Sequence, residues 1–344
     1  MRERLRQKIV ILILTLVVFS CKQKSVSPEI ETYLISAIDS IQNNALMSPN
    51  VDWEIVKRET LEKAEGLETT EQTYTLLKSI LEKLDDNHSF LQKNSKNISY
   101  PNNKEKIEPS PYGSRMKIEH GLHQKDGKTF ARIFVPQGMR GNKFAQDLQD
   151  RIFEMQSNNP CGWIVDLRGN GGGNMWPMLA GIGPLVGSNP LGGSEDGRGQ
   201  KDFYKYEKGK AIYVGIGGKE ESWAQAEEKV ERLSDDIPVA FLIDRGTASS
   251  GEALAVIFKG RKNSKSFGEK THGASTSTRG IKLTDSLNLV IAVSTFQDRD
   301  GNLYLDGVNP DMKIPVGKEM LLPENDPLIE NALNWLYENC HENN

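Results

Sequence analysis

The sequence predicts an α/β protein in which a helical N-terminal domain precedes a core built on a mostly parallel sheet. Apolar residues recur at spacings of three and four between Ser27 and Phe90, which indicates short helices. From residue 131 onward, apolar runs of strand type alternate with amphipathic runs of helix type. Strand followed by helix, repeated along a chain, is typical of a parallel sheet with helices packed on it.

The N-terminus has the pattern of an export signal, so residues 1–21 do not enter the fold prediction. Four basic residues precede an apolar run at residues 9–19, which is shorter than the roughly 20 residues of a membrane-spanning helix. A retained membrane helix is therefore the weaker alternative. Cys21 directly follows the small residue Ser20, and this arrangement resembles the lipobox of bacterial lipoproteins. We expect an exported lipoprotein of the cell envelope that is attached to a membrane through acylated Cys21.

The helical domain is predicted over residues 22–92 and contains three short helices. Asp52 is in position to cap the second helix. Thr69 or Thr70, followed by Gln72, gives the capping signal of the third helix.

The core is predicted over residues 131–344, after a linker or loop region at residues 93–130 that begins with a stretch rich in Asn, Lys and Pro. Strands are expected in the apolar runs 131–135, 162–167, 212–214, 238–243, 280–283 and 287–295. Helices are expected at residues 142–156, 175–187, 221–233 and 251–258. The Gly-rich, charged segment 187–210 is expected to be a surface loop and a candidate lid.

Composition and charge argue against several classes of function. The net charge is −4 and acidic and basic residues are interleaved, so nucleic acid is not an expected partner.

Cys161 and Cys340 are too few for a disulfide framework, and the sequence leaves their pairing open. Neither has metal-ligand spacing, so we expect no metal site. Residues 298–302 look like the start of a calcium loop, but the twelfth position is Asn309, so a hairpin turn is predicted.

Two segments stand at the ends of predicted strands, where α/β sheets bind ligands. In residues 163–173, a strand runs into three consecutive glycines that would let backbone N–H groups approach an anionic oxygen. A flexible turn is the alternative for this segment. In residues 238–253, Ser249 lies where a strand becomes a helix, so its hydroxyl would stand above the sheet beside a helix N-terminus. On spacing alone, helix caps are the better interpretation of Ser249 and Ser250.

Together these segments resemble the C-terminal processing, or tail-specific, proteases of serine peptidase family S41. That family carries Asp-Leu-Arg before a Gly-rich loop and, later, a Thr/Ser-Ala-Ser-x-x-Glu turn. Residues 267–273 and 306–311 extend the match, so it covers most of residues 131–316 in the right order. The resemblance implies a ClpP/crotonase-like protease core.

The resemblance also assigns roles to residues of the two segments. Placed on the family pattern, Ser249 is the nucleophile. The oxyanion hole would be formed by the backbone N–H groups of Ser250 and Gly172, or of the adjacent Gly171. No cofactor is implied.

One departure from the pattern concerns the base. Family members with a Ser/Lys dyad carry Lys at the position of Ala274. The Ser/His branch, of nisin-resistance and tricorn-core type, carries Asp-x-His-Ser/Thr after its N-terminal helices, and this sequence has Asp86-Asn-His-Ser89 in that place. The resemblance therefore implies His88 as the general base. Ser89, Asp86 or Asp306 would orient its ring, and the sequence does not choose among them.

The expected function is hydrolysis of peptide bonds in extended peptides or proteins through an acyl-enzyme at Ser249. Residues 91–130 are too few for a PDZ domain, so the nearest branch is the PDZ-less one and strict recognition of a free C-terminus is not implied. Two alternatives stay open. The first is an inactive protein of the same fold that binds small apolar or peptide ligands. The second keeps the peptidase but makes Lys270 or Lys282 the base, which would raise the pH range of activity above that of a histidine with a pKa near ~6.5.

Overall fold

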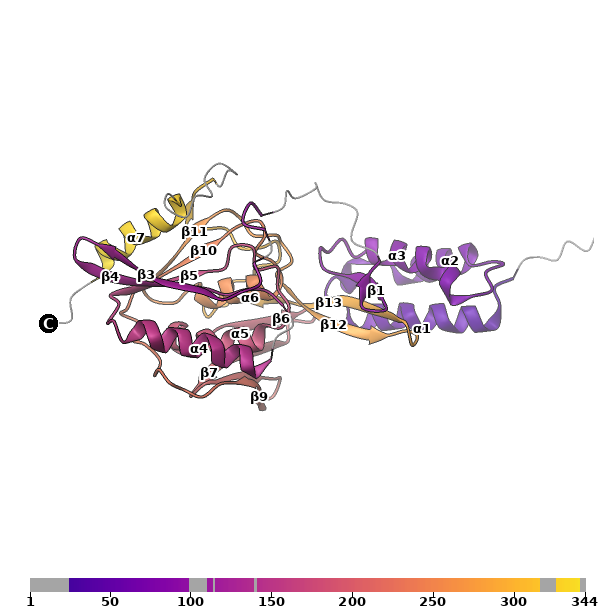
Figure 1. Cartoon of the computed structure of the whole chain (residues 1–344). Coiled ribbons are helices and arrows are strands. Elements are labelled where there is room, and N and C mark those ends of the chain that lie inside the picture. The colour runs from indigo at the N-terminus through magenta and orange to yellow at the C-terminus, as the bar shows by residue number, and fades with distance from the viewer. Residues whose placement is uncertain (1–24, 99–109, 114, 139–140, 316–325, 341–344) are drawn as a thin grey trace, which may run out of the picture.

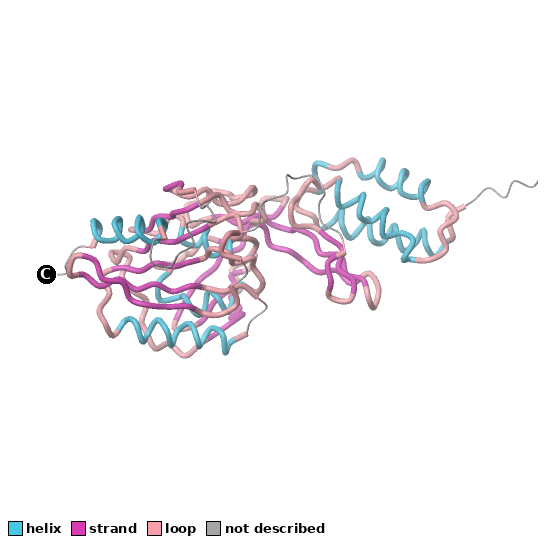
Figure 2. The backbone as a smooth tube through the Cα atoms, turned by 45° about the horizontal axis from the view of Figure 1, so that its top comes forward, coloured by secondary structure: helices cyan, strands magenta, loops and turns pink. Residues whose placement is uncertain are grey.

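The computed structural model describes residues 25–98, 110–113, 115–138, 141–315 and 326–340. The predicted export signal, with Cys21, lies outside the described residues. The molecule is elongated, with a helical N-terminal unit at one end and an α/β core at the other (Figure 1). Long strands of the C-terminal half extend from the core to the helices (Figure 2).

The N-terminal unit contains the three predicted helices, which are α1 (Pro28–Asn44), α2 (Trp53–Lys63) and α3 (Tyr74–Glu82). Two of the predicted caps are present. The Asp52 carboxylate accepts the Ile55 N–H at 3.1 Å, and the Gln72 side chain accepts the Thr69 N–H at 3.0 Å. Each cap satisfies a backbone donor that the first turn of a helix leaves unpaired.

The core sheet has the strand order β14-β11-β10-β5-β4-β3. Its strands are β3 (Glu119–Lys125), β4 (Lys128–Phe134), β5 (Gly162–Asp166), β10 (Val239–Ile243), β11 (Ser264–Gly268) and β14 (Met312–Lys313). All neighbouring pairs are parallel except β3 with β4. The predicted α/β fold with a mostly parallel sheet is therefore confirmed. Strand β3 lies within the predicted linker region and extends the core sheet by one edge strand.

Helices cover both faces of this sheet because its central strands are apolar on both sides. Helices α4 (Asn142–Gln156), α5 (Met175–Ile182) and α6 (Ser250–Phe258) share a buried cluster with Val165 and Phe241. Helix α7 (Pro327–Asn339) packs with Ile164 and Leu242 on the opposite face. Alternate strand residues thus point to different helices, as strand geometry requires.

A second sheet is antiparallel and was not anticipated. Its order is β2-β1-β13-β6-β7-β8-β9, and β12 pairs with β13. Its strands are β1 (Phe90–Lys93), β2 (Lys96–Asn97), β6 (Gly193–Asp196), β7 (Lys201–Glu207), β8 (Lys210–Val214), β9 (Glu220–Gln225), β12 (Thr276–Lys282) and β13 (Leu287–Gln297). Strand β13 pairs with β1 at one end and with β6 at the other. It therefore connects the helical unit to the core.

Two predictions for this region were wrong. Residues 221–233 were expected to form a helix, but the chain turns back at Gly217 and Gly218, both with positive φ, and pairs as β9 with β8. A Gly-Gly turn favours a hairpin over a helix start. Residues 187–210 were expected to be a surface loop, but they include β6 and β7. Tyr204 and Tyr206 alternate with charged residues and are buried. The charged residues made the segment look like a surface loop, although the alternation is that of a strand.

The helical unit has a core that is completed from a distant part of the chain. Leu287, Leu289 and Ile291 of β13 are buried in one cluster with residues of α1, α2 and α3. Because an isolated three-helix unit would leave its apolar face in water, this strand contributes directly to its stability.

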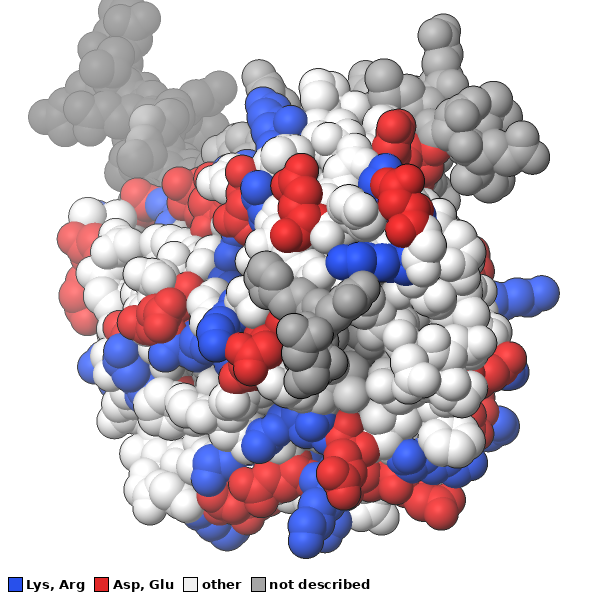
Figure 3. Space-filling model, turned by 90° about the vertical axis from the view of Figure 1, so that its left-hand side faces the viewer, with Lys and Arg blue, Asp and Glu red and all other residues white. Residues whose placement is uncertain are grey.

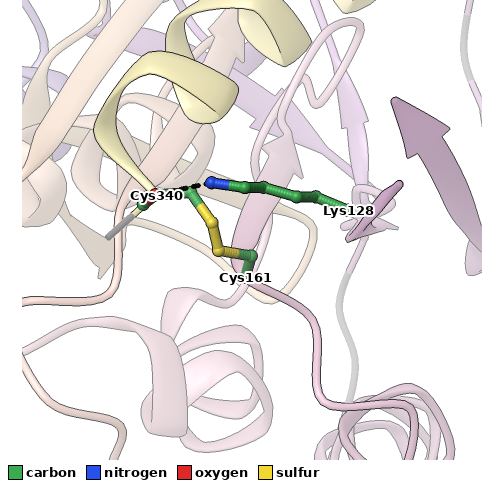
Figure 4. Close-up of a disulfide and its surroundings, with 3 residues drawn as sticks. All are labelled: Lys128, Cys161 and Cys340. Atoms are coloured by element: carbon green, nitrogen blue, oxygen red, sulfur yellow. Dashed lines mark hydrogen bonds between the residues drawn. A yellow bond between two sulfur atoms is a disulfide. The ribbon is translucent and has the colours of Figure 1, made fainter. Parts of the chain in front are cut away.

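A disulfide joins Cys161 to Cys340, with their Cα atoms 5.7 Å apart. This settles the pairing that the sequence left open. It ties the start of β5 to the end of α7, and Lys128 Nζ donates to the Cys340 carbonyl at 2.9 Å (Figure 4). The predicted hairpin turn at residues 298–302 is also confirmed, because the Asp298 N–H donates to the Asn302 carbonyl at 3.0 Å.

Lys and Arg side chains lie among Asp and Glu side chains over the face of the core drawn in Figure 3. None of the helices that the structure describes is both long and apolar enough to cross a bilayer.

Candidate active site

The turn between β10 and α6 is held by the buried carboxylate of Asp244. This carboxylate accepts the N–H of Gly169 at 2.9 Å and the N–H of Gly246 at 3.0 Å. The Thr247 hydroxyl donates to the Leu167 carbonyl at 2.9 Å. The ends of β5 and β10 are therefore locked together, which brings the two predicted site segments side by side.

Ser249 is the N-cap of α6 and has φ 51° and ψ −118°. A positive φ costs a non-glycine residue free energy, and such strain is concentrated at functional sites. The glycine loop packs directly against this turn, since a Cβ added at Gly172 would lie 2.7 Å from Ser249 Cβ and 3.0 Å from the Ser250 nitrogen. Only glycine fits at position 172, and this close approach explains why the loop needs glycine at that position.

Two of the three predicted oxyanion donors are occupied by side chains. The Gly172 N–H donates to Asn170 Oδ1 and the Gly171 N–H donates to Gln137 Oε1, both at 3.0 Å. In the described part of the chain, no acceptor binds the N–H of Ser250 or that of Gly173. The Ser250 hydroxyl donates to the Gly173 carbonyl at 2.7 Å, so these two residues are in direct contact.

The Asp-Leu-Arg segment before the glycine loop is structural. Arg168 is buried and binds Asp166 at 2.8 Å and Asp326, the N-cap of α7, at 2.6 Å. Burial alone would raise the pKa of Asp166, but Arg168 and the nearby Arg132 and Arg115 hold it well below its usual range. This ionic cluster fixes the strand end from which the glycine loop starts.

His88 reaches the core on the short segment before β1, which pairs with β13. Asp86 accepts the N–H of His88 at 2.8 Å and both the N–H and the hydroxyl of Ser89 at 2.6 Å. The Ser89 hydroxyl also accepts the Ala292 N–H at 3.0 Å. Asp86 and Ser89 therefore fix the backbone of this segment and attach it to β13.

The ring of His88 is oriented by a residue that the sequence analysis did not single out. His88 Nδ1 lies 2.8 Å from Thr276 Oγ1, at the start of β12. Asp306, one of the expected orienting residues, is exposed and forms an ion pair with Lys270 at 2.6 Å. With Thr276 at Nδ1, Nε2 is the ring nitrogen that makes no hydrogen bond among the described residues.

A cavity of about 940 Å³ is lined by Ser249, Ser250 and Thr276. Its remaining walls come from the end of α1 and the segment after it, from β6–β9, from β12 and β13 and from the start of α5, so it lies between the helical unit and the core. No hydrogen bond joins His88 to Ser249 among the described residues, and Thr276 is the residue that contacts the histidine and also lines the cavity.

Burial lowers the pKa of His88 to about 4, against the opposing effect of the Asp86 charge. The ring is therefore neutral at physiological pH, which is the state in which a histidine can accept a proton.

Glu252 connects the serine turn to the segment that contains Ala274. One carboxylate oxygen accepts the Thr271 hydroxyl at 2.5 Å and the Gly273 N–H at 2.8 Å. The other accepts the Ala274 N–H and the Ser249 N–H, both at 2.9 Å. Glu252 is fully buried, and burial raises its pKa although these bonds oppose the shift.

The two lysines considered as alternative bases are engaged elsewhere. Lys270 pairs with Asp306 at 2.6 Å and Lys282 pairs with Asp285 at 2.8 Å. Lys282 is also six residues beyond Thr276 along β12, a span of roughly 20 Å in a strand. Among the described residues, no group of three or more His, Cys, Asp or Glu side chains could hold a metal ion.

Sequence reasoning missed Glu252 and Thr276 as site residues. The spacing of Ser249 and Glu252 is that of a capping box, and it could have been used to place Glu252 beside the serine N–H. Thr276 gave no local signal, because its contact with His88 joins residues 188 positions apart.

A serine on a strained strand-to-helix turn, packed against a glycine loop and facing a cavity, is the arrangement of a serine hydrolase. Residues 130–314 match peptidase family S41. The chain therefore belongs to this family of serine peptidases, as its sequence motifs implied.

Individual relatives agree with this assignment. The nisin-resistance protein of Lactococcus lactis subsp. lactis is 26% identical over 290 residues, which cover 84% of this chain and 84% of that protein. The carboxy-terminal processing protease CtpA of Bacillus subtilis is 26% identical over 183 residues, covering 52% of this chain and 34% of that protein.

Solved structures show the same fold. A lipoprotein from Streptococcus agalactiae superposes with a TM-score of 0.62 at 19% identity, covering 90% of this chain and 96% of that one. The photosystem II D1 C-terminal processing protease gives a TM-score of 0.61 at 16% identity, covering 86% and 96%.

Proposed function

We propose that this peptidase cleaves extended peptides through an acyl-enzyme at Ser249, with His88 as general base and acid. The observation that carries the proposal is a strained serine on a cavity that a neutral, half-buried histidine adjoins through Thr276. Ser249 and Thr276 line one cavity, and Thr276 holds His88 Nδ1 at 2.8 Å.

The reaction uses these groups in two steps. Ser249 Oγ attacks the carbonyl carbon of the scissile bond while its proton passes to His88 Nε2. The oxyanion is stabilised by the N–H of Ser250 and by the glycine loop next to it, through Gly173 or through a Gly172 N–H released from Asn170. The C–N bond then breaks and Nε2 returns the proton to the leaving amine. Water repeats the sequence on the ester, with its proton taken by Nε2 and finally given to Ser249.

The absence of a hydrogen bond between the two groups defines what substrate binding must do. His88 and Ser249 are not hydrogen-bonded to each other in the described residues, and catalytic hydrogen bonds of unliganded enzymes often tighten only when substrate is present. Because the helical unit carries His88 and also forms one wall of the cavity, a peptide bound there would contact both units. We infer that this contact completes the Ser/His pair.

Attachment to the cell envelope is part of the proposal. The similarity to a lipoprotein and to a nisin-resistance protein supports an envelope protein, and acylation of Cys21 would tether it. Conversion of Cys21 to Ser should release the protein into the soluble fraction, and labelled fatty acid should no longer be incorporated. Incorporation that survives this change would contradict the anchor.

Fluorophosphonate labelling of the full chain in detergent tests the chemistry. We expect wild type to be labelled at Ser249, and Ser249→Ala and His88→Ala to lose labelling. Ser79→Ala is the control for the serine, because it removes an exposed hydroxyl of α3 that donates to the Thr75 carbonyl, away from the cavity. A folded wild-type protein that stays unlabelled would favour the inactive, ligand-binding alternative. Labelling that persists in His88→Ala but disappears in Lys270→Ala would favour a lysine base.

A further inference from the structure

One wall of the active-site cavity is aromatic. Trp223 stacks on Tyr213 with ring centroids 4.4 Å apart, and Trp176 meets Trp223 edge-on at 4.7 Å. Trp176 also contacts Tyr204 edge-on at 5.2 Å. Three of these rings come from the antiparallel strands β7–β9 and one from α5, and all four line the cavity. Trp223 keeps 48% of its surface exposed, so its ring is available to a ligand.

A carboxylate stands beside this wall. Asp202 lines the cavity and precedes Tyr204 by two residues on β7, so both side chains project from the same face of the sheet. Its carboxylate accepts the Ser194 N–H at 2.8 Å and the Ser194 hydroxyl at 2.9 Å, and it lies beside the Tyr213 hydroxyl. These contacts hold the carboxylate in place.

No cation neutralises Asp202 among the described residues. Three basic side chains line the same cavity, and each is directed to another partner: Arg198 to the Asn43 carbonyl at 3.1 Å, Arg279 to Asn44 Oδ1 at 2.7 Å and Lys201 to Glu195 at 3.2 Å. Burial and the nearby charge of Asp196 raise the pKa of Asp202. A half-buried carboxylate in this position gains from an incoming positive charge.

We propose that this wall is a subsite for a lysine or arginine side chain of the peptide substrate, with Asp202 binding the cationic group and Trp223 covering its aliphatic stem. Aromatic faces next to a carboxylate favour a cation over a neutral side chain, because both attract positive charge. An apolar side chain would fill the aromatic part but would leave the carboxylate without a partner. The subsite therefore selects charge as well as size. The inference rests on the proposed function, since the ligand is its substrate.

The test uses peptide pairs that differ only in charge. A single lysine is moved through an otherwise neutral peptide, and each peptide is matched by its N-acetyl-lysine counterpart. For the full-length wild type, kcat/KM at the best lysine position should exceed that of the acetylated peptide by at least about tenfold. Asp202→Asn should bring this ratio close to one, and Trp223→Ala should lower it partially. Glu207→Gln, which removes an exposed carboxylate from the same strand, should keep the wild-type ratio.

The outcomes separate this subsite from the catalytic proposal. Suppose that fluorophosphonate labels the enzyme but the two peptides of every pair are cleaved at equal rates. This result would overturn the subsite and leave the Ser249 chemistry intact. A lysine-to-acetyl-lysine ratio that survives Asp202→Asn would do the same. If wild type is neither labelled nor active, the catalytic proposal fails, and calorimetric titration with the same pairs decides the subsite. Tighter binding of the lysine peptide that depends on Asp202 supports it, and equal binding overturns it. If Asp202→Asn does not fold, the wild-type ratio and Trp223→Ala still decide.

Discussion

The two groups of the proposed catalytic pair are built in different ways. The serine turn is held entirely within the core, by β10, by the first turn of α6 and by the four bonds that Glu252 makes to the turn and to residues 271–274. His88 depends on distant contacts, because its segment is attached to β13 and its ring to Thr276, which lies 188 residues away. Because the proposed nucleophile is built within the core and the proposed base is delivered by another unit, we expect the nucleophile to be permanently formed and the base to be gained or lost with the position of the helical unit.

The largest expected effect concerns the pair itself. Ser249→Ala and His88→Ala should each lower kcat/KM by about four orders of magnitude or more, and the double variant should lose little beyond either one, because groups that act as a unit are not additive. Steady-state peptide hydrolysis measures this. Lys270→Ala should stay within a few-fold of wild type. Losses that add in the double variant would show that His88 does not act on Ser249.

Glu252→Gln should affect the serine side of the comparison. Each carboxylate oxygen of Glu252 accepts two donors, and an amide in either orientation turns an N–H₂ group toward two of them. We expect a loss of about 1–3 kcal/mol of unfolding free energy from the unsatisfied groups and a fall in labelling rate of about a hundredfold. Chemical denaturation and fluorophosphonate kinetics give the two values. Glu154→Gln, an exposed carboxylate of α4 paired with Arg151, should change neither.

Thr276→Val should affect the histidine side more weakly. It removes the hydroxyl at His88 Nδ1 while keeping the shape of the side chain, so the ring can rotate or change tautomer. We expect kcat to fall about tenfold with stability nearly unchanged, and Thr276→Ser, which restores the hydroxyl, to recover most of the loss. A valine variant with wild-type kcat, or a serine variant no better than valine, would remove Thr276 from the site.

The difference between local sequence signals and contacts over long sequence distances also explains what the sequence could predict. The parallel core, the three N-terminal helices and the serine turn follow from periodicity, capping residues and a strand-to-helix junction, all of which are local. The antiparallel sheet was missed because β7 interleaves lysines with buried tyrosines and β9 carries charges typical of an exposed helix. Thr276 was missed because it reaches His88 only through the pairing of both β12 and β1 with β13, and strand pairing over such distances leaves no trace in a single sequence.

The smallest expected effect is that of pH. With a pKa of about 4, His88 stays about 90% neutral at pH 5, whereas a histidine at the unperturbed ~6.5 would be only about 3% neutral. Labelling of Ser249 should therefore change by less than twofold between pH 7 and pH 5. A fall of about tenfold or more over this range would mean that the ring is solvated, and that the helical unit spends most of its time away from the core.

The pH dependence of the unfolding free energy supplies an independent check on the burial of His88. Between pH 6.5 and pH 4, the unfolded chain binds a proton on His88 that the folded protein, with its lowered pKa, does not. Falling pH therefore favours unfolding, by up to on the order of 3 kcal/mol from this residue. Other groups titrate in this range too, so the informative quantity is the difference between wild type and His88→Gln in unfolding free energy. That difference should shift in favour of the glutamine variant as the pH falls from 6.5 to 4, and a constant difference would place the histidine in solvent on the time average.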